Sequence, residues 1–285
     1  MIGEIWARLA NGSGTTFGVF VASALILGFD LGSASYVMAL FKRWGETGFI
    51  TTALVLTGVL AVTLLFRFVV DRVRRGAVTA LLASGPEGDV ALIMAAAKSD
   101  PAKRPAMQAA VKSVTAAFCA ANLLALFDLP AAIAFTGAVF VVAGSSAGVA
   151  CSTVLVLVIL LMDFAARRSR RLAKGQQSAE IALAKADTAE ASAELAVEVY
   201  ARRVLVEGAA ATDRAIGVMA SGLMLIAAVG VGCILNDPSA TPATLVTANI
   251  LAGRALGVVI SAMGSLARMS SAMPAKLAID SELNA

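Results

Sequence analysis

Residues 50–75 read ITTALVLTGVLAVTLLFRFVVDRVRR, an apolar run that ends in a cluster of arginines. A helix of about 20 mainly apolar residues crosses the hydrocarbon core of a bilayer. A basic flank marks the end that stays in the cytoplasm, because cytoplasmic connections are enriched in Lys and Arg. This stretch therefore predicts a membrane-spanning helix whose C-terminal end faces the cytoplasm.

The composition of the whole chain agrees with that stretch. Of its 285 residues, 59% are hydrophobic and 15% charged, and the mean hydropathy is +0.85. Soluble domains carry roughly a quarter charged residues, so a soluble protein, a disordered chain and a disulfide scaffold are all excluded. The three cysteines, Cys119, Cys151 and Cys233, lie in apolar runs and are expected to be small buried hydrophobes.

The chain has no histidine, which excludes histidine-based triads, histidine-ligated haem and most zinc sites. The net charge of +4 does not point to nucleic acid, since basic residues in a membrane protein report its orientation. We expect no nucleic-acid partner, no metal and no cofactor in this chain.

Six stretches are long and apolar enough to cross a bilayer. They lie at about 16–41, 50–70, 115–142, 149–164, 216–235 and 242–264.

Lysines and arginines gather in the connections 71–112 and 165–215, whereas 143–148 and 236–241 have none. The N-terminal stretch MIGEIWARLANGSG lacks the pattern of a signal peptide. A multi-pass protein with both long connections and both termini in the cytoplasm is therefore predicted.

The two long connections are expected to be largely helical. Residues 172–208 are rich in Ala, Glu, Leu and Val without proline, which predicts a continuous helix with one wet and one packed face. Residues 76–104 are interrupted by Gly85-Pro86 and Asp100-Pro101, which predicts a short transverse helix between two turns.

Three stretches resemble the transmembrane domain of type I secretion ABC transporters, which export proteases and RTX-type polypeptides. Residues 35–78 (SYVMALFKRWGETGFITTALVLTGVLAVTLLFRFVVDRVRRGAV) are similar to the family's Tyr-led turn, Leu-Thr run and arginine-rich exit. Residues 126–135 (LFDLPAAIAF) resemble its Phe-Asp-Leu-Pro, and 241–269 (TPATLVTANILAGRALGVVISAMGSLARM) its Gly-Arg-Ala-Leu stretch. The apolar hairpin at 138–160 fits in position.

The resemblance implies an all-α fold in which residues 1–285 form a single exporter-like transmembrane domain in a bacterial inner membrane. It implies a membrane subunit that dimerises with itself or with a relative among membrane lipids and exports a polypeptide. The sequence contains no GxxxxGK[ST] phosphate-binding loop, so this chain is not expected to be an enzyme, and ATP would act only through a separate ABC subunit.

The resemblance also places coupling tips near 87–99 and 196–210. The candidate residues of these tips, which would receive the motion of an ATPase, are Leu92, Ile93, Met94, Val204 and Leu205. The sequence departs from the family pattern at two places near the predicted outer end of the transport path. Gly32 to Ser35 replace paired prolines, and Lys42 replaces an aspartate.

Charged residues inside the apolar runs are the candidate site residues, because an ionised group at the bilayer centre costs about 2.5–3.5 kcal/mol. Arg254 either lines a translocation path or forms an ion pair with Asp128 or Asp30. Asp30 either binds a cation or pairs with Arg67 or Arg254. Asp128 with Pro130 marks either a kink or a point of substrate passage.

The sequence contains two further features of interest, an arginine-rich stretch after the second apolar run and a GxxxG in the last one. Arg67, Asp71, Arg72, Arg74 and Arg75 are expected to extend towards lipid headgroups. The GxxxG at Gly253 and Gly257 serves equally well for packing within the chain or between chains.

Other functions compete with the exporter. The chain could be a degenerate, non-transporting relative that acts as a structural or accessory subunit of a membrane complex. An ATP-independent carrier would call for an internal repeat or convergent polar residues, and neither is evident. The 285 residues could equally be part of a longer transporter.

Overall fold

The computed structural model describes residues 13–47, 50–83, 104–184, 189–237 and 240–283. Throughout these ranges the regular structure is helical, which confirms the predicted all-α class for them. The helices are α2 (Ser13–Thr47), α3 (Ile50–Ala83), α5 (Arg104–Ala117), α6 (Ala120–Phe127), α7 (Leu129–Ala184), α8 (Ala189–Asn236) and α9 (Pro242–Leu283).

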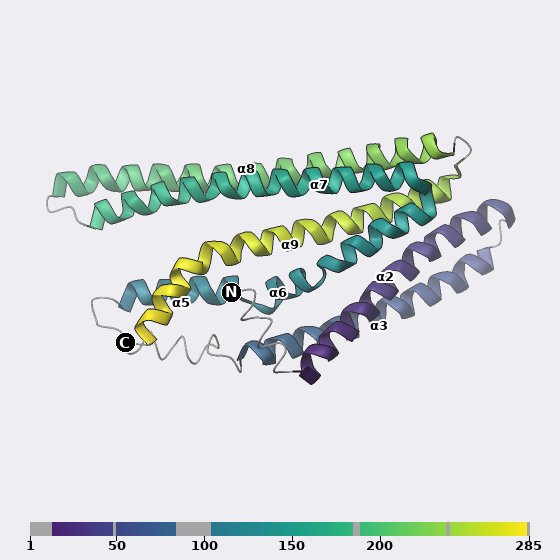
Figure 1. The fold of residues 1–285 in the computed structure, drawn as a ribbon, viewed down its shortest axis with the longest axis horizontal. Helices are drawn as coiled ribbons and strands as arrows, with labels where there is room; N and C mark the ends of the chain where they lie inside the picture. Colours follow the sequence, from purple (N-terminus) through teal and green to yellow (C-terminus); the bar gives the residue numbers. More distant parts are fainter. Residues whose placement is uncertain (1–12, 48–49, 84–103, 185–188, 238–239, 284–285) are drawn as a thin grey trace.

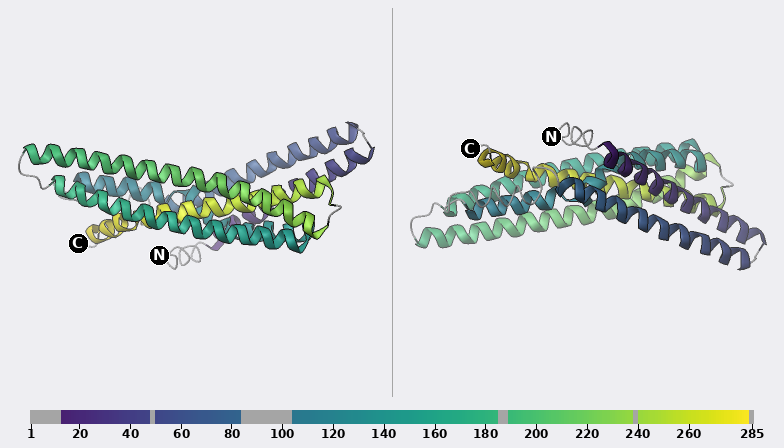
Figure 2. Two further views of the ribbon diagram at one scale, coloured as in Figure 1. Left: turned by 90° about the horizontal axis from the view of Figure 1, so that it is seen from above. Right: turned by 90° about the horizontal axis from the view of Figure 1, so that it is seen from below.

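The helices form a bundle of antiparallel rods around α9 (Figure 1). α2 and α3 form one hairpin, and α7 and α8 form another that extends along the opposite side of α9. Towards the C-terminal end of α2, the α2–α3 hairpin diverges from the α7–α8 hairpin (Figure 2). α9 therefore joins two arms that separate at one end.

In the part of the chain that the structure describes, four helical stretches are long and apolar enough to cross a membrane: Thr16–Arg43, Ala53–Ala80, Ala110–Arg168 and Pro242–Leu277. A shorter apolar stretch, Ser221–Asn236, ends α8. The predicted spans 115–142 and 149–164 both lie inside Ala110–Arg168.

α7 is not one straight rod, because it folds back on itself at Gly144. This residue has φ 84° and ψ 178°, a backbone conformation that side chains disfavour. A Cβ at this position would also collide with the side chain of Asn236 at the end of α8. Glycine is thus required at the bend by both backbone geometry and space.

Glycine also brings α8 onto the backbone of α7. A Cβ at Gly232 would lie 2.7 Å from the Cα of Ala147 and 3.0 Å from the carbonyl oxygen of Ser146. Close backbone approach through a small residue is a common way for helices to pack in membranes, where lipid removes the usual hydrophobic drive. The α7–α8 contact at this level depends on the absence of a side chain.

The buried apolar residues form two clusters that meet along α9. The larger joins α7, α8 and α9 around residues such as Phe135, Val229 and Leu251. The smaller joins α3, α5 and α6 to the C-terminal half of α9 around Val114 and Met269. α9 contributes to both clusters, and so does α2, through Ala34 in the larger and Val19 in the smaller.

Two predictions about helix continuity are wrong. The range 172–208 does not form one continuous helix, because α7 ends at Ala184 and α8 begins at Ala189, antiparallel to it. Helix propensity is high on both sides of the reversal and carries no information about where the chain turns back. The predicted span 115–142 is likewise broken, between Ala117 and Ala120. The predicted transverse helix falls largely outside the described residues.

Gly232→Ala is expected to lower the free energy of unfolding by about 1–3 kcal/mol, because the added methyl group overpacks against Ala147. Gly230→Ala is the matched control, since a Cβ there meets nothing within 4 Å. Thermal unfolding of the purified protein in mild detergent, followed by circular dichroism, measures both. Equal unfolding temperatures for the two variants would contradict the close contact.

Candidate functional site

Three charged or polar clusters lie within the apolar helices, and the first surrounds Asp30 on α2. Its Oδ1 lies 2.7 Å from Nε of Arg67 on α3 and 2.6 Å from Nη1 of Arg254 on α9. Arg254 also donates from Nη2 to the Ser33 hydroxyl at 2.8 Å, and that hydroxyl donates to the Asp30 carbonyl oxygen. One carboxylate therefore ties three helices together.

The residues of this Asp30 cluster lie inside three of the membrane-length segments. Asp30 and Arg67 are each 14 residues from the first and 13 from the last residue of Thr16–Arg43 and Ala53–Ala80, respectively. Arg254 lies 12 residues after the start of Pro242–Leu277. At 1.5 Å per residue, Asp30 and Arg67 are about 20 Å from either end of their helical segments. Asp71, Arg72, Arg74 and Arg75 follow within Ala53–Ala80, so Arg67 lies near the charged end of the apolar part of α3.

The second cluster surrounds Arg74 on α3, whose side chain is only 5% exposed. It forms an ion pair with Asp128, between α6 and α7, and contacts Asp71 at 3.0 Å. It also donates to the Ser23 hydroxyl on α2 at 3.0 Å. The prediction that this arginine extends towards headgroups is wrong, because packing encloses it between two carboxylates. Arg75, which is 62% exposed, contacts Asp71 from outside at 2.7 Å.

The third cluster surrounds Asn122, which is buried at the start of α6. Its amide donates to the carbonyl oxygens of Ala116 and Ala117 at 3.2 and 2.8 Å, and so satisfies acceptors that the end of α5 leaves open. Its Oδ1 accepts from Arg268 on α9 at 2.7 and 3.0 Å, and from Ser265 at 3.3 Å. This side chain makes the helix break between α5 and α6 tolerable inside an apolar environment.

The predicted candidate residues are distributed over different clusters. Arg254 pairs with Asp30 rather than with Asp128, and Asp30 pairs with both of its proposed partners. Pro130 is the second residue of α7, where proline's missing N–H removes no helical hydrogen bond. Asp128 thus marks a helix junction as well as an ion pair.

The candidate coupling residues are only partly placed. Val204 and Leu205 are exposed on α8, as a partner surface would require. They lie 15 and 16 residues after Ala189, about 22 Å along the helix, on the side of the hairpin and not at its end. Leu92, Ile93 and Met94 fall outside the described residues.

Several polar residues of these clusters were not predicted. They are Ser23, Ser33, Asn122, Ser265 and Arg268. Asn122 offers the clearest signal in the sequence, because an amide within the apolar run 117–127 requires internal hydrogen-bond partners. The serines carry no such signal, since each can satisfy its own hydroxyl on the preceding helical turn.

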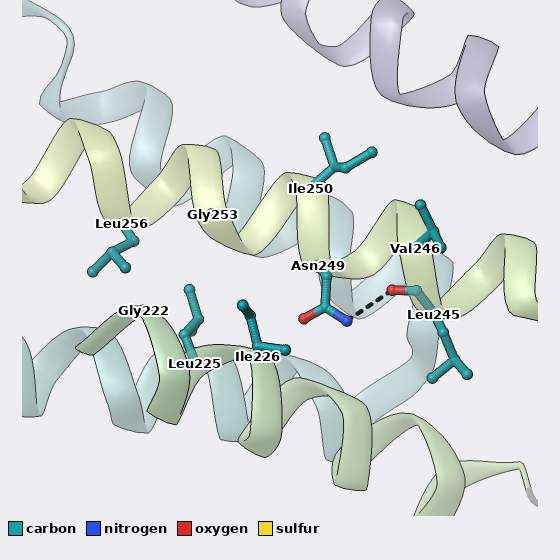
Figure 3. Close-up of a pocket in the computed structure, with 9 residues that line it drawn as sticks. All are labelled: Gly222, Leu225, Ile226, Leu245, Val246, Asn249, Ile250, Gly253 and Leu256. Atoms are coloured by element: carbon teal, nitrogen blue, oxygen red, sulfur yellow. Dashed lines mark hydrogen bonds between the residues drawn. The ribbon is translucent and has the colours of Figure 1, made fainter. Parts of the chain in front are cut away.

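A shallow groove of about 400 Å³ lies between α8 and α9 (Figure 3). Its lining is apolar apart from Asn249, whose amide donates to the Leu245 carbonyl oxygen at 3.0 Å. Among the described residues, no group of three or more His, Cys, Asp or Glu side chains could hold a metal ion. The groove contributes shape but no reactive group.

The cysteines and the GxxxG can also be placed. Cys151 and Cys233 are buried in the larger core, as predicted, and Cys119 is half-buried at the α5–α6 break. Gly253 and Gly257 are exposed on α9, and a Cβ at either would meet nothing within 4 Å. The GxxxG is therefore not used for packing within the described part of the chain.

No protein-family model matches this sequence, and no curated protein matches it.

Asp30→Asn is expected to lower the free energy of unfolding by about 2–3 kcal/mol, because two guanidinium groups lose their shared counter-ion in an apolar environment. Asp163→Asn is the matched control. Asp163 pairs with Arg167 at 2.6 Å, but both side chains are well exposed. Loss of this ion pair should therefore lower the free energy of unfolding by less than about 0.5 kcal/mol. Unfolding temperatures measured in mild detergent compare the two, and similar small shifts would argue against a structural ion cluster.

Asn122→Ala is expected to lower the free energy of unfolding by about 2 kcal/mol. The substitution leaves the carbonyl groups of Ala116 and Ala117 and the Arg268 side chain without their hydrogen-bond partner in an apolar interior. The control is Asn249→Ala, which removes a hydrogen bond only to its own helix and should change stability little. Chemical denaturation of the purified variants measures the difference. If Asn249→Ala lowered the free energy of unfolding more than Asn122→Ala, the structural role given to Asn122 would be wrong.

Proposed function

We propose that this chain is the membrane subunit of a type I secretion ABC export system, and that ATPase domains on another chain drive it. In this proposal the polypeptide crosses a bacterial inner membrane six times, with both termini in the cytoplasm. The bend at Gly144 divides the long apolar stretch Ala110–Arg168 into two crossings, and Ser221–Asn236 completes another with the residues before it. The choice of the type I secretion family rests on the sequence resemblance of residues 35–78, 126–135 and 241–269.

The α7–α8 hairpin is the observation that carries the proposal. α7 stays helical from Arg168, where its apolar stretch ends, to Ala184, a further 16 residues or about 24 Å. α8 is already helical 32 residues before Ser221, where its described apolar stretch begins. Such a rigid projection beyond the bilayer is suited to transmit the motion of a soluble domain to the membrane helices.

The charge pattern supports the orientation. The described parts of the basic connections, 71–83, 104–112, 165–184 and 189–215, lie towards the end of the bundle where α7 ends and α8 begins (Figure 1). The Gly144 bend and the passage from α8 to α9 lie at the opposite end (Figure 1). Positive residues favour the cytoplasmic side, so the hairpin would project into the cytoplasm, where ATP is available.

A structural or accessory subunit of a membrane complex is the second candidate. The observation that favours it is the pairing of Asp30 and Asp128 with arginines on neighbouring helices, which ties the α2–α3 hairpin to α9 and α6. A transporter needs these arms to move, whereas a scaffold benefits from their attachment. The two functions differ in whether an ATPase binds the projecting hairpin.

If the exporter proposal is correct, the native complex extracted in mild detergent will contain an ABC ATPase subunit, identified by mass spectrometry. Replacing the exposed Val204 and Leu205 by Glu should release that subunit and lower the ATPase activity of the complex several-fold. Leu277→Glu, at an exposed position near the C-terminal end of α9, is the matched control and should leave the complex intact. Recovery of homo-oligomers or an unrelated complex without a nucleotide-binding protein would instead favour the scaffold.

A further inference from the structure

We propose that the α2–α3 hairpin is a hinged arm and that the contact between Asp30 and Arg254 is the latch that holds it against α9. Asp30 contacts one arginine inside the hairpin, Arg67 on α3, and one outside it, Arg254 on α9. The Ser33 hydroxyl on α2 also accepts a hydrogen bond from Arg254 at 2.8 Å. If the Arg254 contacts open, Asp30 keeps Arg67 as its counter-ion and moves with it.

The cluster around Arg74 is divided in the same way. Arg74 contacts Asp71 on its own helix at 3.0 Å and pairs with Asp128 between α6 and α7. The central charge of each cluster therefore has one partner within the hairpin and one in the rest of the bundle. An unpaired charge away from water is costly, so a hairpin whose charges are paired internally separates at a lower cost.

The two clusters differ in their access to water, which decides where the hairpin opens and where it stays attached. The Arg254 side chain is 30% exposed, so water can solvate it once Asp30 has left. The Arg74 side chain is only 5% exposed, and Val19 and Val78 of the hairpin are buried in the smaller core. The pivot is therefore the Arg74 end of the hairpin, and the Asp30 end is the one that opens.

The Asp30 cluster also lies where the burial of the hairpin ends. Among the described side chains of α2, Ser33 and Ala34 are the last buried ones, and α3 has no buried side chain from Ala53 to Val73. Beyond this level the hairpin diverges from the α7–α8 hairpin (Figure 2). Opening here requires the loss of one ion pair, one hydrogen bond and the apolar contacts around Ala34.

The length of α2 predicts how far the free end of the hairpin moves. Asp30 lies 11 residues after Val19, and Phe41 lies 22 residues after it, which is twice as far from the pivot. A single layer of water, about 3 Å thick, between Asp30 and Arg254 would therefore move Phe41 by about 6 Å relative to α9.

This inference does not depend on the proposed export function, because it concerns movement within one chain. The test is a spin–spin distance measured by pulsed electron paramagnetic resonance on the full chain in lipid nanodiscs. The labels are attached at two exposed positions, through Phe41→Cys on α2 and Leu235→Cys on α8. Cys119→Ala removes the half-buried cysteine, whereas Cys151 and Cys233 are buried and should stay unlabelled.

Arg254→Gln and Arg67→Gln are the matched pair of variants, because each removes one guanidinium group from the same carboxylate. Arg254→Gln opens the latch and should add a population in which the distance from Phe41 to Leu235 is longer by about 6 Å. Arg67→Gln leaves the contact between Asp30 and α9 in place and should keep the distance of the parent protein. A cluster that contributed only to stability would give the same distances in both variants.

Two further measurements complete the test. Labels at Leu25 and Leu54, both exposed within the hairpin, should keep their distance in Arg254→Gln, because the hairpin moves as one unit. Ser33→Ala removes only the hydroxyl that accepts from Arg254, so it should add a smaller population at the longer distance. This mild variant decides the question if Arg254→Gln does not fold.

Three results would overturn the proposal. They are an unchanged distance from Phe41 to Leu235 in Arg254→Gln, an equal or greater lengthening in Arg67→Gln, and a changed distance within the hairpin in Arg254→Gln. If Arg254→Gln does not fold, an unchanged distance in Ser33→Ala overturns it instead.

Discussion

The contact of the Asp30 carboxylate with Arg67 and Arg254 is the constraint on which the arrangement of the two arms depends. It joins α2, α3 and α9 inside three of the membrane-length segments. The pair of Arg74 and Asp128 repeats the principle nearer the end of α3 and joins it to the α6–α7 junction. The α2–α3 hairpin is therefore attached through charges as well as through buried apolar residues such as Val19, Ala34 and Val78, and much of its apolar surface remains exposed.

The α7–α8 hairpin is held by a different kind of contact. Here Gly144 permits the reversal of the chain, and Gly232 lets the backbone of α8 approach that of α7. The larger core, from Phe135 to Val259, fills the space between this hairpin and α9. Close packing thus holds the α7–α8 hairpin, whereas ion pairs together with apolar contacts hold the α2–α3 hairpin. The position of the α2–α3 hairpin should therefore be the more sensitive of the two to the loss of a charge.

This division bears on both candidate functions. In an exporter, the charged attachment of α2 and α3 is the contact that could be remade during a transport cycle, while the close-packed hairpin conveys motion as a rigid element. In a scaffold, the same ion pairs add to the attachment between the arms.

Much of the fold could be predicted from the sequence, and the candidate site only in part. Apolar length predicts the membrane-length helices, and the residues of the Asp30 pairing could be named because a charge in an apolar run needs a counter-charge. The choice of Asp30 over Asp128 for Arg254 could not be made, since it depends on which helix faces α9. Arg74 was misjudged because its neighbours, Arg72 and Arg75, give it the local pattern of a headgroup flank.

By itself the sequence determined that the chain is helical, that its apolar helices are long enough to cross a membrane, and that glycine lies in the predicted connection 143–148. These follow from composition and local pattern, which act over one or two helical turns. Only the tertiary structure decided that 172–208 is divided between two antiparallel helices, that Asn122 closes the end of α5, and that two arginines share Asp30. Those outcomes depend on contacts between residues far apart in the chain, whose energies no local pattern contains.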